Sequence, residues 1–404
     1  MTDAADLRAE LADLPRPLRV RLDAAGFDAE RLLTLAASLQ ARARAPGDKR
    51  GGSTERDDRN RIRGVVDPPR PDDVVDAPAP QTAEHERLSA VGLEALRRGE
   101  VAFCVMAGGM ATRMGGVVKA LVEVLPGQTF LELRLNENAA WSRRATRPVP
   151  LWLMTSEATE GPIREALERV GAGPHIATFS QDLGLRLTSD GRLFRAQDGA
   201  PSTYATGHGD LPDALKRSGL LSAFVAGGGK FVWITNLDNL GATIDPALLG
   251  LFIERAAELM VEVTSKADDK GGIPVWTDAE DGHGGVVRRL QVLEEFRLPS
   301  GFDAAQVRVF NTNTLLVKAE ALLRVQVRWS WFEVEKKVDE RVAVQFERLI
   351  QELTAAMTAV YVRVPREGAV SRFLPVKDHD ELNKRRDTIR EVARQRGMLP
   401  QESK

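Results

Sequence analysis

The stretch FVWITNLDNLGATID, residues 231–245, holds the residues whose types and spacing point most directly to chemistry. An apolar run with β propensity, Phe231–Ile234, leads into a carboxylate, Asp238, that is flanked by amide side chains. Ligands of open α/β sheets bind beyond the carboxyl ends of the strands. Mg²⁺ prefers one or two carboxylates together with phosphate oxygens and water. The pattern therefore predicts a Mg²⁺ ligand at Asp238, and the alternative interpretation is an Asx-rich turn.

A second candidate is the glycine-rich segment VAFCVMAGGMATRMGGVVK at residues 101–119. Its apolar half predicts a strand, and the loop that follows contains Gly108, Gly109, Arg113 and Lys119. Glycines allow the backbone to turn tightly and to present N–H groups to phosphate oxygens, while the cations neutralise charge. The spacing fits neither GxxxxGK[ST] nor GxGxxG. The segment is therefore a candidate phosphate-binding loop or an ordinary turn.

Three further loops place polar residues after predicted strands. Gln181, in TFSQDL, can donate and accept hydrogen bonds together, which suits the imide edge of uracil as well as a surface position. His208 stands between Gly207 and Gly209, an arrangement that suits a ring held for stacking or hydrogen bonding. Lys270 precedes a Gly–Gly pair and could place an ammonium over a phosphate, or could simply be solvated.

Taken in order, these segments resemble the UTP–glucose-1-phosphate uridylyltransferases, the UDP-glucose pyrophosphorylase family. The glycine loop is similar to the family's GGxGT(R/T)MG followed by a lysine, and ATGHGD is similar to its PGHGD. Residues 371–377, SRFLPVK, are identical to a family segment. The resemblance runs from about residue 101 to 377. It implies a Rossmann-like, GT-A-like nucleotidyltransferase fold of the α/β class, in which helices cover both faces of a mixed sheet.

The resemblance also implies a role for each matched residue. Arg113 and Lys119 would hold the triphosphate of UTP, Asp238 would bind Mg²⁺, and Lys270 and Lys377 would balance charge at the sugar phosphate. The remaining residues implied are Gly108, Gly109, Met154, Gln181, Gly207 and His208 for the nucleotide, and Asn236 and Asn313 for the sugar.

The implied reaction joins UTP and a sugar 1-phosphate, with glucose 1-phosphate favoured, into a UDP-sugar and pyrophosphate. A phosphomonoester is largely dianionic at neutral pH, because its second pKa is about 6, and so needs no general base. Two alternatives stay open. One is a related enzyme that uses an N-acetylhexosamine 1-phosphate. The other is a nucleotide-sugar-binding or scaffolding protein with weak or no catalysis, which the departures Ala111, Val118 and Asp269 motivate, because the family has Gly, Pro and Val there.

The elements that must position these loops alternate in type, which favours a layered α/β sheet. We predict four segments: helices at 1–44, a Pro/Gly/charge-rich linker or extended arm at 45–81, a catalytic domain at 82–377, and a charged helix with a tail at 378–404. Within the third segment, residues 338–354 resemble a helix of the family. The predicted strands are Val101–Met106, Leu151–Met154, His175–Phe179, Phe231–Thr235, Met260–Thr264, Val307–Asn311 and Ala359–Arg363.

Composition narrows the class of partner. The 404 residues carry 56 basic and 58 acidic side chains, a balance that argues against nucleic acid as a partner. No apolar run approaches the ~18 residues that span a bilayer, and the acidic N-terminus is unlike a signal peptide. The single cysteine, Cys104, fits a reducing cytoplasm. Only 27 residues follow Lys377, too few for the family's C-terminal β-helix, so we expect a monomer or a dimer that does not use a β-helix.

Overall fold

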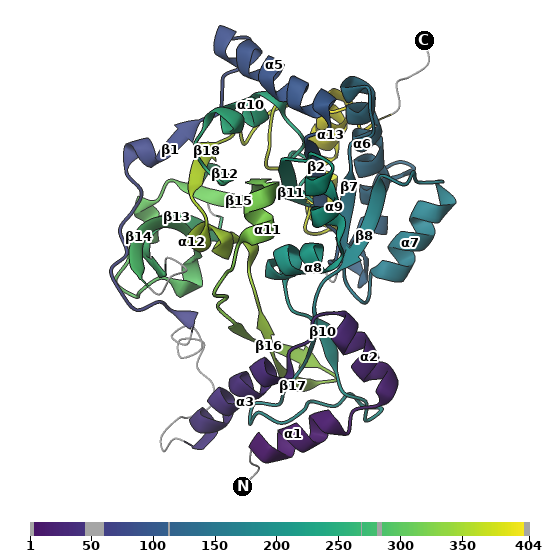
Figure 1. Ribbon diagram of the computed structural model, residues 1–404, viewed down its shortest axis with the longest axis vertical. Coiled ribbons are helices and arrows are strands. Elements are labelled where there is room, and N and C mark those ends of the chain that lie inside the picture. The colour runs from purple at the N-terminus through teal and green to yellow at the C-terminus, as the bar shows by residue number, and fades with distance from the viewer. Residues whose placement is uncertain (1–3, 45–59, 112–113, 268, 281–284, 400–404) are drawn as a thin grey trace.

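The computed structural model describes residues 4–44, 60–111, 114–267, 269–280 and 285–399. Its centre is an eight-stranded mixed sheet in the order β1-β18-β12-β15-β11-β2-β7-β8 (Figure 1). Only β15 runs antiparallel to its neighbours within this sheet, so the other seven strands end at one edge. The strands are β1 (Val74–Asp76), β2 (Val101–Met106), β7 (Leu151–Thr155), β8 (Ile176–Ser180), β11 (Phe231–Asn236), β12 (Leu259–Ser265), β15 (Val309–Lys318) and β18 (Ala359–Arg363).

The sequence of β2 shows why the sheet is covered on both faces. All six residues of VAFCVM are buried, which is typical of a parallel strand inside an α/β sheet. Phe103 and Val105 pack in the core on one face, whereas Cys104 and Met106 pack in the core on the other. Every strand predicted from the sequence overlaps a strand of this sheet, and the predicted α/β class is confirmed.

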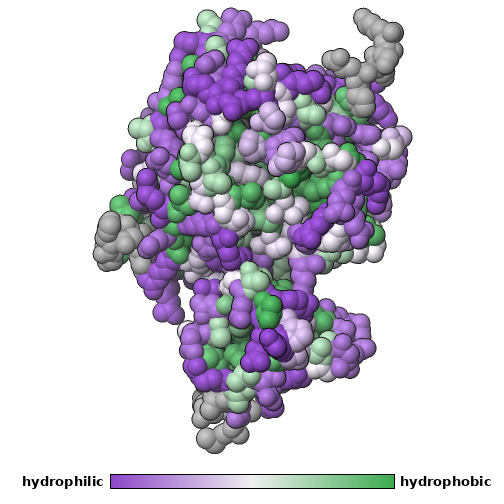
Figure 2. Space-filling model, turned by 45° about the vertical axis from the view of Figure 1, so that its right-hand side comes forward, coloured by the Kyte–Doolittle hydropathy of each residue, from purple (hydrophilic) through white to green (hydrophobic). Residues whose placement is uncertain are grey.

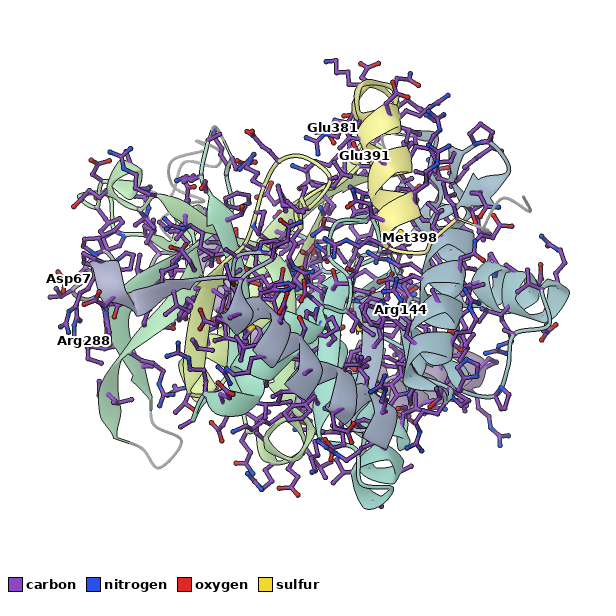
Figure 3. All side chains as sticks on the ribbon, turned by 90° about the horizontal axis from the view of Figure 1, so that it is seen from above. Asp67, Arg144, Arg288, Glu381, Glu391 and Met398 are labelled. Atoms are coloured by element: carbon purple, nitrogen blue, oxygen red, sulfur yellow. The ribbon has the colours of Figure 1, made fainter. Side chains whose placement is uncertain are left out.

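Different helices cover the two faces (Figure 1). The first face is covered by α5 (Ala83–Arg98), α6 (Phe130–Ala145), α7 (Glu160–Arg169), α10 (Pro246–Glu254) and α13 (His379–Gln395). The second is covered by α8 (Leu211–Arg217), α9 (Leu220–Ala226), α11 (Ala319–Arg324) and α12 (Leu353–Ala356). The segment that follows α13 lies beside α6, as the neighbouring positions of Met398 and Arg144 show (Figure 3). The side chain of Asn136 in α6 donates to the carbonyl of Met398 at 2.9 Å.

The N-terminal helices build a second, smaller core. Helices α1 (Ala4–Ala12), α2 (Arg16–Ala24) and α3 (Ala29–Arg44) pack on two hairpins through residues such as Leu22, Leu185 and Phe346. Figure 2 shows this lobe set off from the main body by a narrower waist. The two hairpins of the lobe consist of β9 (Leu183–Leu185) with β10 (Thr203–Ala205), and β16 (Phe332–Val338) with β17 (Arg341–Glu347).

The helix expected over residues 338–354 is wrong. The first half of this stretch forms β17, and a short helical segment, Ile350–Ala356, begins only after it. Val344 and Phe346 alternate along the strand and pack in the core of the lobe. The β propensity and the period of two in RVAVQF, reinforced by pairing with β16, therefore outweigh the resemblance to a helix.

The described part of the predicted arm, residues 60–81, adds an edge strand to the main sheet. Its strand β1 pairs in parallel with β18. Before this strand, Asp67 exchanges backbone hydrogen bonds with Trp276 and pairs with Arg288 of β14 (Val286–Glu294; Figure 3). Among the described residues, no helix is both long and apolar enough to cross a bilayer. The remaining strands are β3 (Met110–Ala111), β4 (Val117–Val118), β5 (Glu123–Leu125), β6 (Gln128–Thr129), β13 (Gly272–Glu280) and β14 (Val286–Glu294).

Candidate functional site

The glycine loop and the end of β11 meet in a direct contact. The Nζ atom of Lys119 donates to Oδ2 of Asp238, and the two side chains are only 18% and 17% exposed. The contact exists because β2 and β11 are adjacent parallel strands, so the loops that follow them leave the same edge. The cation predicted for phosphate and the carboxylate predicted for metal therefore lie together, 119 residues apart in sequence.

The two asparagines predicted at the sugar also meet. Nδ2 of Asn313 donates to Oδ1 of Asn236 at 3.1 Å. The β12–β15 ladder shifts register next to Asn313, and bulges of this kind re-aim side chains beside functional sites. The backbone of Asn313 lies in the left-handed region, at a φ of 60°, a strained conformation that clusters at such sites. Its Oδ1 atom is buried and has no hydrogen-bond partner in the described structure.

The residues predicted at the base form a third group. Nε2 of Gln181 donates to the carbonyl of Gly207 at 2.9 Å. Gly108 approaches the same side chain so closely that a Cβ there would lie 2.2 Å from the glutamine Oε1. Nδ1 of His208 accepts the backbone N–H of Ile350 at 3.0 Å. Met154 is 1% exposed and packs in the core beneath these loops.

A buried ion network that sequence reasoning missed lies behind this group. Arg348 is about 2% exposed and donates to Asp182 at 2.6 Å and to Asp210 at 2.9 Å. Burial, together with the neighbouring Asp182, raises the pKa of Asp210 to about 7. A Cβ at Gly207 or Gly209 would lie 2.5–2.6 Å from the backbone of Arg348, so both glycines serve close packing. The only sign of this network in the sequence is that Asp182 and Asp210 each lie within two residues of a predicted ligand, Gln181 and His208 respectively.

His208 makes the stability of the fold depend on pH. Burial lowers its pKa to about 4, whereas a histidine in an unfolded chain has a pKa of about 6.5. Between pH 4 and about pH 6.5, His208 is therefore mostly protonated in the unfolded chain and mostly neutral in the folded chain. The contribution of neutral His208 is therefore complete above about pH 6.5 and is lost as the pH falls toward 4, by about 3 kcal/mol in total.

The difference between wild type and His208→Asn isolates this contribution, because the Oδ1 atom of asparagine can still accept the N–H of Ile350. Urea unfolding of both proteins from pH 7 to pH 4 is expected to show a steeper loss of stability for wild type. Parallel pH profiles would contradict the assignment. The raised pKa of Asp210 acts in the opposite direction in both proteins and cancels in the difference.

The SRFLPVK segment is attached to the Asp238 loop by a buried arginine. Arg372 pairs with Glu262 through bonds of 2.6 and 2.8 Å and donates to the carbonyl of Thr243 at 2.8 Å. The side chain of Asn239 bonds the backbone of the segment on both sides, at 3.1 Å to the carbonyl of Arg372 and at 2.8 Å to the N–H of Leu374. These bonds fix the backbone that leads to Lys377, whose side chain is exposed.

The structure shows how the chain accommodates two of its departures from the family pattern, Ala111 and Asp269. Ala111 lies in β3 and does not have a positive φ, whereas Gly115 and Gly116 do among the described residues of this loop. Asp269 pairs with Arg366 at 2.6 Å; burial opposes its ionisation, but the hydrogen bond and charge of Arg366 lower its pKa overall. The neighbouring Lys270 is exposed. Arg113 lies outside the described residues.

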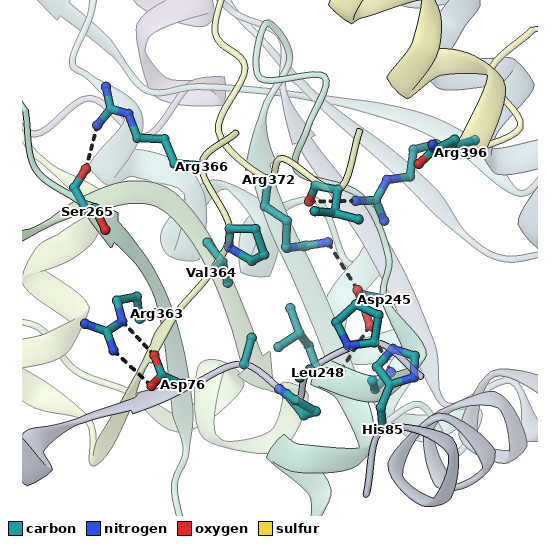
Figure 4. A pocket seen from close by; sticks show the side chains of 18 residues that line it. Asp76, His85, Asp245, Leu248, Ser265, Arg363, Val364, Arg366, Arg372 and Arg396 are labelled. Carbon is teal, nitrogen blue, oxygen red and sulfur yellow. Dashed lines mark hydrogen bonds and ion pairs between the residues drawn. The ribbon is translucent and has the colours of Figure 1, made fainter. Parts of the chain in front are cut away.

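A cavity of about 680 Å³ opens beyond the ends of β1, β12 and β18 (Figure 4). Arg363 pairs there with Asp76 at 2.6 and 2.9 Å, and Arg366 is already engaged by Asp269. None of the predicted site residues lines this cavity. Since acidic side chains already balance these arginines, the cavity is a weaker candidate for phosphate than the edge that contains Lys119 and Asp238.

Comparisons with known proteins agree with the motifs. A model of the UTP–glucose-1-phosphate uridylyltransferase family matches residues 55–400. The UTP–glucose-1-phosphate uridylyltransferase of Saccharomyces cerevisiae is 31% identical over 334 residues, which are 78% of this chain and 63% of that protein. The chain therefore spans just under two thirds of the length of this relative.

Two solved structures have a similar fold. A mutant UDP-glucose pyrophosphorylase from Leishmania major aligns with a TM-score of 0.67 at 22% identity, covering 88% of this chain and 74% of that one. A uridine diphosphate N-acetylglucosamine pyrophosphorylase from Trypanosoma brucei aligns with a TM-score of 0.66 at 20% identity, covering 81% and 72%. From the extent of the family match and the sequence identity, the chain belongs to the UTP–glucose-1-phosphate uridylyltransferase family.

Proposed function

We propose that the protein is a Mg²⁺-dependent uridylyltransferase that converts UTP and a sugar 1-phosphate into a UDP-sugar and pyrophosphate. The contact between Lys119 and Asp238 carries this proposal. It brings a cation suited to a triphosphate and a carboxylate suited to a metal together at the carboxyl edge of the sheet, where ligands of α/β folds bind. Family membership supports the same reaction.

The donor set fits a Mg²⁺ ion that arrives with the nucleotide. Among the described residues, no group of three or more His, Cys, Asp or Glu side chains could hold a metal ion. Asp238 would therefore supply one carboxylate, and phosphate oxygens and water would supply the other ligands, as is usual for Mg²⁺. When bound, the ion would neutralise charge on the phosphates of UTP.

The residues of the chain would act by holding and aligning the phosphates. Lys119 would exchange its contact with Asp238 for one with the departing pyrophosphate, while Lys270 and Lys377 balance the charge of the sugar phosphate. An oxygen of the sugar phosphate forms a bond to the α-phosphorus of UTP. The bond from that phosphorus to its bridging oxygen breaks, and pyrophosphate leaves with the electron pair. Alignment and charge neutralisation supply the rate, without a general base.

Asn236 and Asn313 would hold the sugar hydroxyls, with glucose 1-phosphate as the favoured substrate. The buried, unpartnered Oδ1 atom of Asn313 supports this role, because a buried acceptor without a donor is costly until a ligand supplies one. An N-acetylhexosamine 1-phosphate is the alternative substrate, since the fold is equally similar to a pyrophosphorylase of that kind. Loss of catalysis is less favoured, because Asp269 is paired with Arg366.

The proposal is tested by measuring pyrophosphate released from UTP with a panel of sugar 1-phosphates. We expect release with glucose 1-phosphate, slower or no release with N-acetylglucosamine 1-phosphate, and none when EDTA replaces Mg²⁺. Release with the N-acetylhexosamine alone would reassign the substrate. No release with any sugar, together with measurable binding of a UDP-sugar, would instead identify a nucleotide-sugar-binding protein.

A further inference from the structure

The loop that carries Asp238 rests on a buried arginine of helix α6. The side chain of Arg134 is 0% exposed. Its guanidinium donates to three main-chain carbonyls of the loop, at 2.6 Å to Asn239, at 2.9 Å to Ala242 and at 3.3 Å to Asn236. In the sequence, Asp238 lies between Asn236 and Asn239. One side chain therefore fixes the backbone on both sides of the proposed metal ligand.

The charge of Arg134 is balanced within the same helix. Its Nη1 atom pairs with Oε2 of Glu137 at 2.8 Å, and both side chains are fully buried. A buried ion pair is weak evidence for stability, because desolvation offsets the attraction and apolar replacements of similar volume are often neutral or stabilising. The three hydrogen bonds to the loop carbonyls indicate instead that the pair fixes the position of the loop.

An arginine suits this position for a geometric reason. The loop from Asn236 to Ala242 turns three carbonyl groups inward, and buried carbonyls need donors. A planar guanidinium has five N–H donors in a fixed fork, whereas a lysine ammonium is a compact point charge. The fork reaches all three carbonyls and still pairs with Glu137.

The same contact extends to the segment that ends in Lys377. The carbonyl of Asn239 accepts from Arg134, while its side chain holds the backbone at Arg372 and Leu374. Displacement of the loop would therefore displace two proposed catalytic segments together.

We propose that Arg134 is a positioning residue, which sets the Asp238 carboxylate for nucleotide-bound Mg²⁺ without touching substrate. This inference rests on the proposed function of the site. It also predicts that binding and stability can be separated, because removal of the Glu137 charge destabilises the buried arginine but leaves its three bonds to the loop carbonyls in place.

The test compares two variants by thermal unfolding, by Mn²⁺–UTP binding followed by electron paramagnetic resonance, and by steady-state kinetics. Arg134→Met/Glu137→Met replaces the buried pair with apolar side chains. We expect it to unfold below the wild-type temperature, because three buried loop carbonyls lose their donor. We also expect it to bind Mn²⁺–UTP about 10-fold more weakly or worse, and to lose roughly 10²-fold in kcat, the cost of displacing a group by about 1 Å.

Glu137→Gln is the matched control. It keeps the three carbonyl bonds but leaves the arginine charge without its partner, so we expect lower thermal stability with Mn²⁺–UTP binding close to wild type. A structural role alone would make binding follow stability in both variants. Arg134→Lys should recover little, because an ammonium cannot reproduce the fork.

The inference is overturned if the folded double variant binds Mn²⁺–UTP as wild type does. If wild type binds Mn²⁺–UTP but releases no pyrophosphate with any sugar 1-phosphate, the proposed reaction fails, while the binding comparison still decides the role of Arg134. If wild type does not bind Mn²⁺–UTP at all, both proposals fail.

Discussion

Replacing Asp238 by asparagine is expected to lower pyrophosphate release by about 10³-fold at saturating UTP. A neutral amide is a poor Mg²⁺ ligand, and a metal ion contributes several kcal/mol of charge stabilisation in the transition state. A loss of roughly 4 kcal/mol corresponds to about 10³-fold in rate. The variant also removes the carboxylate that Lys119 contacts. Thermal unfolding should change little, because asparagine has nearly the shape of aspartate and its Oδ1 atom can still accept from Lys119.

Asp245→Asn provides a matched control in the same segment. Asp245 caps helix α10 by accepting two backbone N–H groups, and asparagine is an equally good cap. The two variants thus make the same chemical change seven residues apart. Turnover by Asp238→Asn that matches turnover by Asp245→Asn would contradict a metal-binding role for Asp238.

Replacing Lys377 by alanine is expected to lower turnover by about 10²–10³-fold, the typical cost of removing one preorganised donor at a developing charge. The segment that carries Lys377 is held by Arg372 and Asn239, and the lysine side chain itself is exposed. The loss should therefore occur without a change in fold, and it is measured as kcat for pyrophosphate release beside the circular dichroism spectrum.

Lys384→Ala, at an exposed position on helix α13, removes the same charge a short distance along the chain. It should leave turnover close to wild type and so excludes a general effect of net charge. Near-normal turnover by Lys377→Ala would refute its role at the phosphates.

The sheet and the meeting of the loops were predictable because both depend on local signals. Apolar runs such as Val101–Met106 mark buried parallel strands, and parallel strands deliver their following loops to one edge. The pairing of Lys119 with Asp238 follows from that geometry. Asn236 and Asn313 meet for a different reason, because Asn236 ends β11 whereas Asn313 lies at the register shift within β15, the antiparallel neighbour of β11.

The supports beneath the loops were not predictable. Arg134, Arg348 and Arg372 each stand beside apolar residues. Arginine is nevertheless mostly exposed in proteins, and only the tertiary packing shows that each of the three is at most about 2% exposed. Apart from Glu137, three residues from Arg134, the hydrogen-bonding partners of their side chains lie between 102 and 166 residues away, so no local spacing connects them. The strand β17 was missed for a similar reason, because the N-terminal helices that bury it come from the far end of the chain.

The edge strand β1 has a consequence for solubility. A strand at the rim of a sheet exposes a row of unpaired N–H and C=O groups that can pair with another molecule. Here only three residues of the arm cover β18, and the salt bridge between Asp76 and Arg363 seals the end of the pairing. A short edge strand with charged side chains disfavours pairing with the edge of another sheet. We therefore expect the arm to reduce edge-to-edge aggregation.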